Sequence, residues 1–262
     1  MNNYTIPQKR HAPPSGEPLP IEGRSFLTKV LVRIISKIEK LNITYSKVGN
    51  PPFFDRNVFP WILEIEKAYP DIQEEFLSVI KRKSELPNFQ EVVPGVSNIT
   101  KDDGWKSLLF TGYGAESKRN KILCPNTWAA IERIPGLETA LFSIFEPGKH
   151  VPSHRGPYNG VLRLHLGLLI PKESEKVAIR VDTETYHWKP GEAVIFDDTY
   201  QHEAWNYSNE IRAVLFIDFA RPLRFPANII NWTALRLAFL TPYIREAASA
   251  EAKWEKKFYK NA

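Results

Sequence analysis

The pattern of apolar and polar positions along the chain changes character near residue 138. Before it, apolar residues mostly recur at helical spacing. After it, short apolar runs alternate with turn residues, which is typical of β-strands. From residue 228 the helical spacing returns. Short strands at regular spacing predict a jelly roll or barrel. We therefore expect a mainly β core with N-terminal and C-terminal helices.

The pattern also divides the chain into four parts. Residues 1–24 are rich in proline and poor in apolar residues, so we expect a disordered tail. A helical region packed on the core is predicted for 25–100, the β domain for 101–225, and a helical extension for 226–262.

Three local features refine the helical parts. Pro70 is predicted to end one helix, and Asp71, with Glu74 three residues later, to cap the next. Residues 84–104 are predicted to be loop. Pro242 is predicted to interrupt the C-terminal helix, with a charged tail after it.

The first predicted helix is amphipathic. Ser25 is suited to cap it, and its apolar residues fall on one side. The other side is basic and holds Lys29, Arg33, Lys37 and Lys40. Such a helix usually packs on the protein's own core. Binding to a membrane surface is the alternative, and the sequence leaves both open.

Composition narrows the class of protein. Apolar residues make up 43% of the chain, enough for a packed core. The net charge of +5 permits an anionic partner without requiring one. No basic run is interleaved with aromatic residues, so nucleic-acid binding is not expected.

The single Cys124 cannot form an intramolecular disulfide and fits a reducing compartment. The first apolar run begins only at Phe26, so no signal peptide is expected. No apolar stretch reaches the roughly 20 residues that span a bilayer. We expect a cytoplasmic protein, with peripheral association at the inner face of the membrane as the further option.

The strand predicted at 161–170 carries polar side chains on one face. Side chains alternate along a strand, so Arg163, His165 and Gly167 share one face and leucines the other. Apolar flanks favour burial of both faces, although a surface strand with a solvated arginine is the alternative. No acidic residue lies on this strand, so a carboxylate ligand would balance a buried arginine. Arg212 repeats the pattern at the start of the last predicted strand.

Two of the six histidines stand in matching contexts. His154 and His202 are each predicted to follow a strand, and each precedes an arginine by a similar distance. These two are candidate metal ligands, with a structural role as the alternative. His150 and His154 have the spacing of a helical zinc pair, but Pro152 between them disfavours a helix.

At these residues the chain resembles the aspartyl/asparaginyl β-hydroxylase family of Fe(II)- and 2-oxoglutarate-dependent oxygenases. The resemblance covers roughly residues 100–222, and bacterial lipid A and ornithine-lipid hydroxylases look similar over the same span. It is carried by Phe142-Ser-Ile-x-x-Pro-Gly-x-His150-x-x-x-His154-x-Gly156-Pro, Leu162-Arg-x-His-Leu-Gly-Leu, Trp188-x-x-Gly, Phe196-Asp-Asp-x-x-x-His-Glu-x-Trp and Arg212.

The resemblance implies a double-stranded β-helix that uses Fe(II), 2-oxoglutarate and dioxygen to hydroxylate an unactivated C–H bond. It implies His154 and His202 as the iron ligands and Arg212 as the partner of the distal carboxylate of 2-oxoglutarate. Further contacts to 2-oxoglutarate are implied for Trp105, Ser143, Arg163 and His165.

One position separates possible relatives and substrates. Most such oxygenases have a carboxylate ligand two residues after the first histidine, where this chain has Gly156. The animal hydroxylases resemble it in having glycine there, which favours an Asp or Asn residue as substrate. The basic first helix favours a lipid acyl chain instead. Asp198 is expected to orient a water rather than bind metal. A non-catalytic metal- or ligand-binding cupin-like module remains the alternative function.

Overall fold

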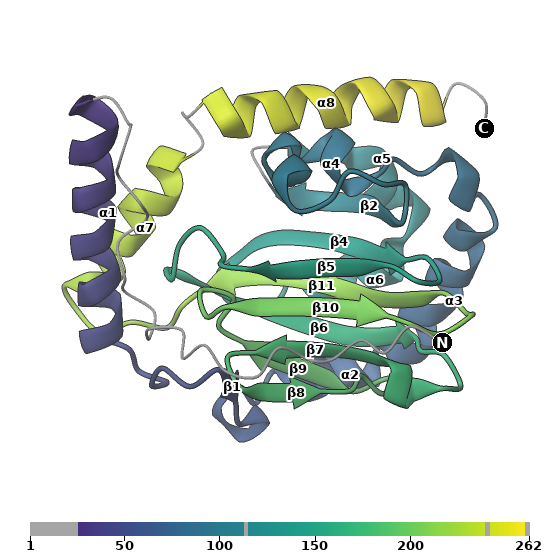
Figure 1. Cartoon of the computed structure of the whole chain (residues 1–262), viewed down its shortest axis with the longest axis horizontal. Coiled ribbons are helices and arrows are strands. Elements are labelled where there is room, and N and C mark those ends of the chain that lie inside the picture. Colours follow the sequence, from purple (N-terminus) through teal and green to yellow (C-terminus); the bar gives the residue numbers. More distant parts are fainter. Residues whose placement is uncertain (1–25, 113–114, 239–241, 260–262) are drawn as a thin grey trace.

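A computed structural model describes residues 26–112, 115–238 and 242–259, and the predicted tail and Ser25 lie outside these ranges (Figure 1). Two antiparallel sheets pack face to face. The larger sheet has the order β1 (Phe53–Phe54), β9 (Ala193–Phe196), β6 (Val161–Leu169), β11 (Arg212–Ala220), β4 (Leu137–Phe145), β2 (Trp105–Gly112), β3 (Ala115–Glu116). The smaller sheet has the order β5 (His150–His154), β10 (His202–Asn206), β7 (Val177–Val181), β8 (Glu184–Tyr186).

Helices cover the outer face of the larger sheet and one end of the sandwich. They are α1 (Phe26–Thr44), α2 (Ile62–Lys67), α3 (Tyr69–Ile80), α4 (Phe89–Val92), α5 (Lys118–Leu123), α6 (Pro125–Ile131), α7 (Ala227–Ala238) and α8 (Pro242–Phe258). Short 3-10 helices lie at Arg56–Val58, Lys83–Glu85, Pro94–Asn98 and Ser174–Lys176. Figure 1 shows α1 and α7 side by side at one end. Within the described ranges, no helix has the length and apolar character needed to cross a membrane.

Strand β6 is buried on both faces, as its sequence predicts. The leucines from Leu162 to Leu168 pack into the apolar layer between the larger sheet and its helices. The alternate side chains point into the layer between the two sheets, where the neighbours of His165 include Phe196 and Phe216. The prediction of a mainly β, jelly-roll core with flanking helices is confirmed.

The first of these helices, α2, ends at Lys67, just before Pro70 as predicted, but the predicted start of the next helix with Asp71 as its cap was wrong. α3 begins at Tyr69 with Ala68 at its N-cap, so Pro70 lies in the first turn and Asp71 follows inside the helix. Proline is tolerated there because the first helical N–H groups have no partner within the helix. The capping box lies instead at Asn88 and Glu91, which start α4 within the predicted loop.

The sequence pattern also missed strands. β2 begins at Trp105, well before the predicted change near residue 138, and β5 and β10 were not predicted as strands. The charged segment after Pro242 is helix α8 rather than a tail. The division into four parts stays a prediction, although β1 pairs with β9 and so joins the predicted helical region to the larger sheet.

Candidate active site

His154 and His202 face each other across neighbouring strands. His154 ends β5 and His202 begins β10, and the two are register partners in the smaller sheet. Their ring centroids lie 4.1 Å apart with the planes inclined by 51°. The sequence predicted that each would follow a strand, which is wrong for His202. The sheet register, rather than matching strand ends, brings the two imidazoles together.

Each of the two rings directs its Nδ1 atom at a backbone carbonyl oxygen. Nδ1 of His154 lies 2.8 Å from the carbonyl oxygen of Pro152, and Nδ1 of His202 lies 3.0 Å from that of Tyr200. A carbonyl oxygen only accepts, so each Nδ1 carries the proton and each Nε2 keeps its lone pair. Backbone carbonyls orient metal-binding histidines in this way. The pair therefore has the protonation that metal binding requires.

The protonation is reinforced by burial. Burial lowers the pKa of His202 well below its ordinary value, and His154 and Arg163 lower it further. Burial also lowers the pKa of His154, with Arg163 adding to the effect. Both histidines are therefore neutral near pH 7, as ligands to a divalent cation must be.

Gly156 and Asp198 share the place beside this pair. A Cβ atom on Gly156 would lie 2.3 Å from the carboxyl carbon of Asp198, so a larger residue cannot stand there without displacing that carboxylate. The backbone N–H of Gly156 donates to the carbonyl oxygen of Asp198 at 2.7 Å. Gly156, two residues after His154, has no carboxylate, but the carboxylate of Asp198 lies directly beside it.

Asp198 is buried, and burial raises its pKa to about 7, against the lowering effect of Arg163. Its carboxylate forms an ion pair with Arg163 at 3.0 Å, but neither oxygen has hydrogen-bond geometry with any described residue. Among the described residues, no group of three or more His, Cys, Asp or Glu side chains is arranged to hold a metal together. That Asp198 orients a water rather than binds metal stays a prediction.

Arg163 already has protein partners. Its Nε donates to Asp218 Oδ1 at 2.8 Å and its Nη2 to Asp218 Oδ2 at 3.0 Å. Asp218 lies directly opposite Arg163 on β11. No acid lies on β6, as the sequence shows, but Asp218 on the neighbouring strand balances Arg163, so no carboxylate ligand is needed for that purpose. Arg163 therefore holds Asp218 and Asp198 in place, and a contact with 2-oxoglutarate stays a prediction.

Arg212 is the opposite case. Its side chain is 1% exposed, and neither Nε nor Nη1 has a hydrogen-bond partner among the described residues. The guanidinium lies over the rings of Phe145 at 3.6 Å and Trp188 at 4.6 Å. Burial lowers its pKa to about 9. A buried, uncompensated cation is costly, so this arginine is placed for an anionic ligand.

His165 and Trp188 add unpaired donors beside Arg212. Both ring nitrogens of His165 and Nε1 of Trp188 are buried without a hydrogen-bond partner in the part of the chain described. The two rings lie 5.9 Å apart. Burial lowers the pKa of His165 well below its ordinary value, and the charges on Arg212 and Arg163 act in the same direction. A neutral His165 can donate one hydrogen bond to an oxygen of a bound carboxylate.

Trp105 and Ser143 lie on adjacent strands of the same inner layer. Trp105 Nε1 donates to Ser143 Oγ at 3.0 Å, and the Ser143 hydroxyl keeps its own proton for a ligand. Ser107, opposite Ser143 on β2, has a buried Oγ without a partner among the described residues. The sequence reasoning named neither Ser107 nor Trp188 as a site residue. Only the Trp188-x-x-Gly motif could have pointed to Trp188.

A glycine allows Trp188 to reach this layer. A Cβ atom on Gly167 would lie 2.3 Å from the carbonyl oxygen of Lys189, in the turn that follows Trp188. Gly167 also accepts a hydrogen bond from Gly191 N at 2.9 Å. Any larger residue would push the turn away from β6 and move the indole away from Arg212.

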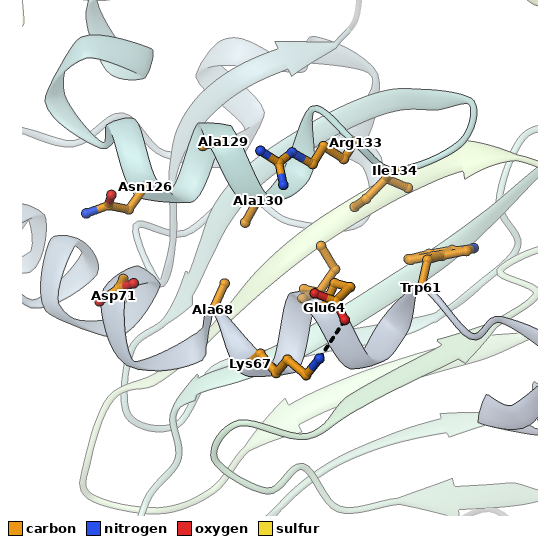
Figure 2. A pocket seen from close by; sticks show the side chains of 11 residues that line it. Trp61, Glu64, Lys67, Ala68, Asp71, Asn126, Ala129, Ala130, Arg133 and Ile134 are labelled. Carbon is orange, nitrogen blue, oxygen red and sulfur yellow. Dashed lines mark hydrogen bonds and ion pairs between the residues drawn. The ribbon is translucent and has the colours of Figure 1, made fainter.

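The other histidines in the β core have different roles. His150 Nε2 lies 3.0 Å from a Glu203 carboxylate oxygen, and His187 Nδ1 lies 3.1 Å from two backbone carbonyl oxygens. A pocket of about 560 Å³ lies elsewhere, between α2, the start of α3 and α6 (Figure 2). Its lining includes Trp61, Glu64 and Arg133 and none of the predicted site residues. The histidine pair and the polar layer behind it are the better candidate for chemistry.

The residues present fit a divalent metal and a dicarboxylic acid. Two neutral imidazoles offer Nε2 lone pairs, which suits a first-row transition metal. Behind them lie the Arg212 guanidinium, the neutral His165 imidazole, the Trp188 indole N–H and the Ser107 hydroxyl, which have buried polar atoms without partners among the described residues. All seven predicted site residues point into the layer between the two sheets or lie at its edge. Trp188 and Ser107, for which the sequence predicted no role, and Asp198, which was expected to orient a water, complete the polar lining.

Comparison with known proteins points the same way. The model of the aspartyl/asparaginyl β-hydroxylase family matches residues 66–222. An ornithine lipid ester-linked acyl 2-hydroxylase of Rhizobium tropici is 52% identical over 243 residues, which cover 93% of this chain and 86% of that protein.

More distant similarities cover less. The human aspartyl/asparaginyl β-hydroxylase is 33% identical over 62% of this chain, and the match spans 21% of that longer protein. Among solved structures, a prolyl-4-hydroxylase of Pseudomonas putida aligns over 58% of this chain and 87% of its own, at 17% identity and a TM-score of 0.43.

Proposed function

We propose that this chain, which belongs to the aspartyl/asparaginyl β-hydroxylase family, is an Fe(II)- and 2-oxoglutarate-dependent oxygenase that hydroxylates carbon 2 of an acyl chain on an ornithine-type lipid. The observation that carries the co-substrate assignment is the buried Arg212, whose Nε and Nη1 lack partners among the described residues, beside His165 and Trp188. A dicarboxylic acid bound there would satisfy all three.

The residues divide the work between metal and co-substrate. His154 and His202 would hold the metal through Nε2, with Nδ1 anchored on backbone carbonyls. Bound Fe(II) with 2-oxoglutarate supplies the activation of dioxygen for C–H hydroxylation. Arg212 would neutralise the distal carboxylate, with the Ser143 hydroxyl as a further donor. The apolar walls of the layer, including Phe145 and Phe216, exclude water from the reacting atoms.

The lipid assignment is supported by the length and strength of one similarity. The ornithine lipid acyl hydroxylase matches nearly the whole chain, α1 and α7 included, whereas the human hydroxylase matches 62% of it. Gly156 does not require a peptide substrate, because the Asp198 carboxylate occupies the space beside it. The absence of a side chain there has a packing reason that applies to either substrate.

The test is turnover with defined substrates. The purified protein with Fe(II), ascorbate and 2-oxoglutarate should release succinate, and ornithine lipid in detergent micelles should gain one oxygen atom on its ester-linked acyl chain by mass spectrometry. His202→Ala should abolish both. His187→Ala, a change at an exposed histidine, should leave both intact. Hydroxylation of an Asp-containing peptide with no change in the lipid would refute the substrate, and undiminished turnover by His202→Ala would refute the site.

A further inference from the structure

Helix α1 contacts the rest of the protein partly through buried polar side chains. Among residues 29–44 of this helix, the buried residues are Glu39, Asn42 and Val32. Arg155 Nη2 donates to Glu39 Oε1 at 2.7 Å, and Asn42 Nδ2 donates to Asn159 Oδ1 at 3.0 Å. An amphipathic helix that packs on its own core would bury its apolar stripe instead.

Two large apolar side chains of α1 remain in contact with solvent, whereas Val32 is buried and Ile35 and Ile38 are partly buried. Leu31 is 51% exposed and Ile34 49% exposed, one turn apart on the same side of the helix. Packing on the protein's own core therefore accounts for part of the apolar stripe of α1 and leaves Leu31 and Ile34 exposed.

Helix α7 lies against α1 and shows the same inversion. Its buried residues are Ala227 and Asn231, and Asn231 bonds to Gly160 O and to the Tyr158 hydroxyl. Large apolar side chains on α7 and just before it are exposed instead: Phe225, Ile229, Trp232 and Leu237. We call Leu31, Ile34 and these four residues the α1–α7 apolar surface. Two adjacent helices that both expose apolar residues indicate a binding surface rather than scattered exceptions.

The charges around this surface are almost all positive. α1 carries Lys29, Arg33, Lys37 and Lys40, and its one acid is the buried Glu39, paired with Arg155. α7 carries Arg236 and no acid. A partner of the opposite sign is therefore required. A second copy of the chain would present the same cations, whereas a bilayer with anionic lipids offers both hydrocarbon and negative charge.

The surface is tied to the histidine end of the site. Arg155, which bonds Glu39 of α1, directly follows His154. Tyr158 in the same loop contacts Asn42 of α1 and Asn231 of α7. In Figure 1, β5 ends and β10 begins at the end of the sandwich that carries these helices. A ligand held on the α1–α7 surface would therefore meet the protein beside the histidine pair.

We infer that the α1–α7 apolar surface seats the protein on a bilayer that contains anionic lipids, with Trp232 and Leu31 inserted among the headgroups and the cations of α1 over the anionic phosphates. The docking itself stands on exposure and charge. Its use, which is to present an acyl chain to the histidine end, rests on the proposed function.

The experiment measures vesicle binding by flotation. The full chain should float with phosphatidylglycerol-containing vesicles that lack ornithine lipid and should stay behind with pure phosphatidylcholine, and high salt should release it. Leu31→Glu with Trp232→Glu should reduce the bound fraction at least about tenfold, since each loses burial in hydrocarbon and adds repulsion. Ile122→Glu is the matched control, because Ile122 on α5 is 79% exposed and far from this surface in sequence.

The readouts separate a wrong inference from other failures. The double variant should keep the unfolding temperature of the wild type and its succinate release with detergent-solubilised lipid, because neither residue lines the site. Equal flotation of wild type and double variant, or no flotation of the wild type, overturns the inference while leaving the proposed function standing. A concentration-dependent dimer that the double variant abolishes would assign the surface to a second copy and overturn it as well.

Discussion

The buried polar residues of the site differ in whether they have partners within the protein. Arg163 and Arg212 sit on neighbouring strands in the same buried layer, yet Arg163 has two carboxylates and Arg212 has aromatic rings. The first is part of the folded protein's own charge balance. The second carries an imbalance that a ligand would remove.

The same substitution at the two arginines should therefore have opposite effects. Arg212→Met should leave the free energy of unfolding of the ligand-free protein unchanged or raise it by about 1–4 kcal/mol, because it removes an uncompensated buried charge. Arg163→Met should lower it by about 3–5 kcal/mol, because Asp218 and Asp198 lose their counterion. Urea unfolding of both variants measures this. Equal destabilisation would contradict the distinction drawn between the two arginines.

Substitutions at Gly156 and Asp198 should affect stability in a non-additive way. Gly156→Ala forces its Cβ against the Asp198 carboxylate and should cost about 1–3 kcal/mol, the range for overpacking. The double variant Gly156→Ala with Asp198→Ala should recover most of that loss, because the second change clears the space. Unfolding free energies of the two single variants and the double variant give the coupling. Additive effects would show that the two side chains do not compete for one place.

For single residues, the sequence predicted those that stand in recognisable motifs. It did not predict pairs that are brought together only by the register of neighbouring strands. The histidines and arginines stand in recognisable motifs, so their candidacy could be predicted. The pairing of Arg163 with Asp218 could not, because 55 residues separate them and only the alignment of β6 with β11 joins them. Asp198 beside Gly156 is a similar case.

Among the elements, the long strands and amphipathic helices were predictable from periodicity, and the short strands were not. β5 reads His-Val-Pro-Ser-His and β10 reads His-Glu-Ala-Trp-Asn, and neither shows the apolar alternation of a half-buried strand. β10 is nearly all buried, whereas in β5 only Val151 is buried. These two strands carry the histidine pair, so the strands that the sequence pattern did not predict are those that position the candidate metal ligands.

Helix α8 has its own testable feature in Glu251. This carboxylate is buried without a partner among the described residues, and burial raises its pKa to about 8, with Glu255 adding to the effect. A folded pKa above the unfolded value means that its contribution to stability is fully present below about pH 4.5 and is lost as pH rises through 8. Glu251→Gln should therefore be more stable than the wild type at pH 9 and similar near pH 5.

Chemical unfolding across that pH range is the measurement for Glu251. The difference in unfolding free energy between variant and wild type should grow between pH 5 and pH 8 and then level off. A constant difference across the range would mean that Glu251 is ionised in the folded protein, with a counter-charge supplied from outside the described residues.

For the whole molecule, ligand binding and stability should be linked. A redox-inert divalent metal together with 2-oxoglutarate at about 100 times its dissociation constant adds about 2.7 kcal/mol to the unfolding free energy. For a chain of this size that should raise the melting temperature by roughly 5–10 °C. The rise should require both ligands, and it should disappear in His154→Ala and in Arg212→Met. An equal rise with metal alone would argue against a co-substrate pocket around Arg212.

The overall architecture could be predicted from the sequence, whereas the packing of helix α1 at one end of the sandwich could not. Alternating strands flanked by helical spacing predicted a covered β sandwich, and the sandwich is there. The basic amphipathic helix left core packing and membrane binding open. Periodicity tells which side chains share a helix face but not which face meets the protein, so the burial of Glu39 and Asn42 could not be predicted.

Under the proposed function, the link between Glu39 and Arg155 would bear on which carbon of the acyl chain is hydroxylated. It fixes α1 to the residue after His154, so the depth at which the helix sits would set the height of the histidines above the lipid headgroups. Carbons close to the ester would reach the metal, and those farther along would stay in the hydrocarbon. The hydroxylated carbon would then be selected by its distance from the surface of the bilayer. The length or unsaturation of the rest of the acyl chain would have little effect on which carbon is hydroxylated.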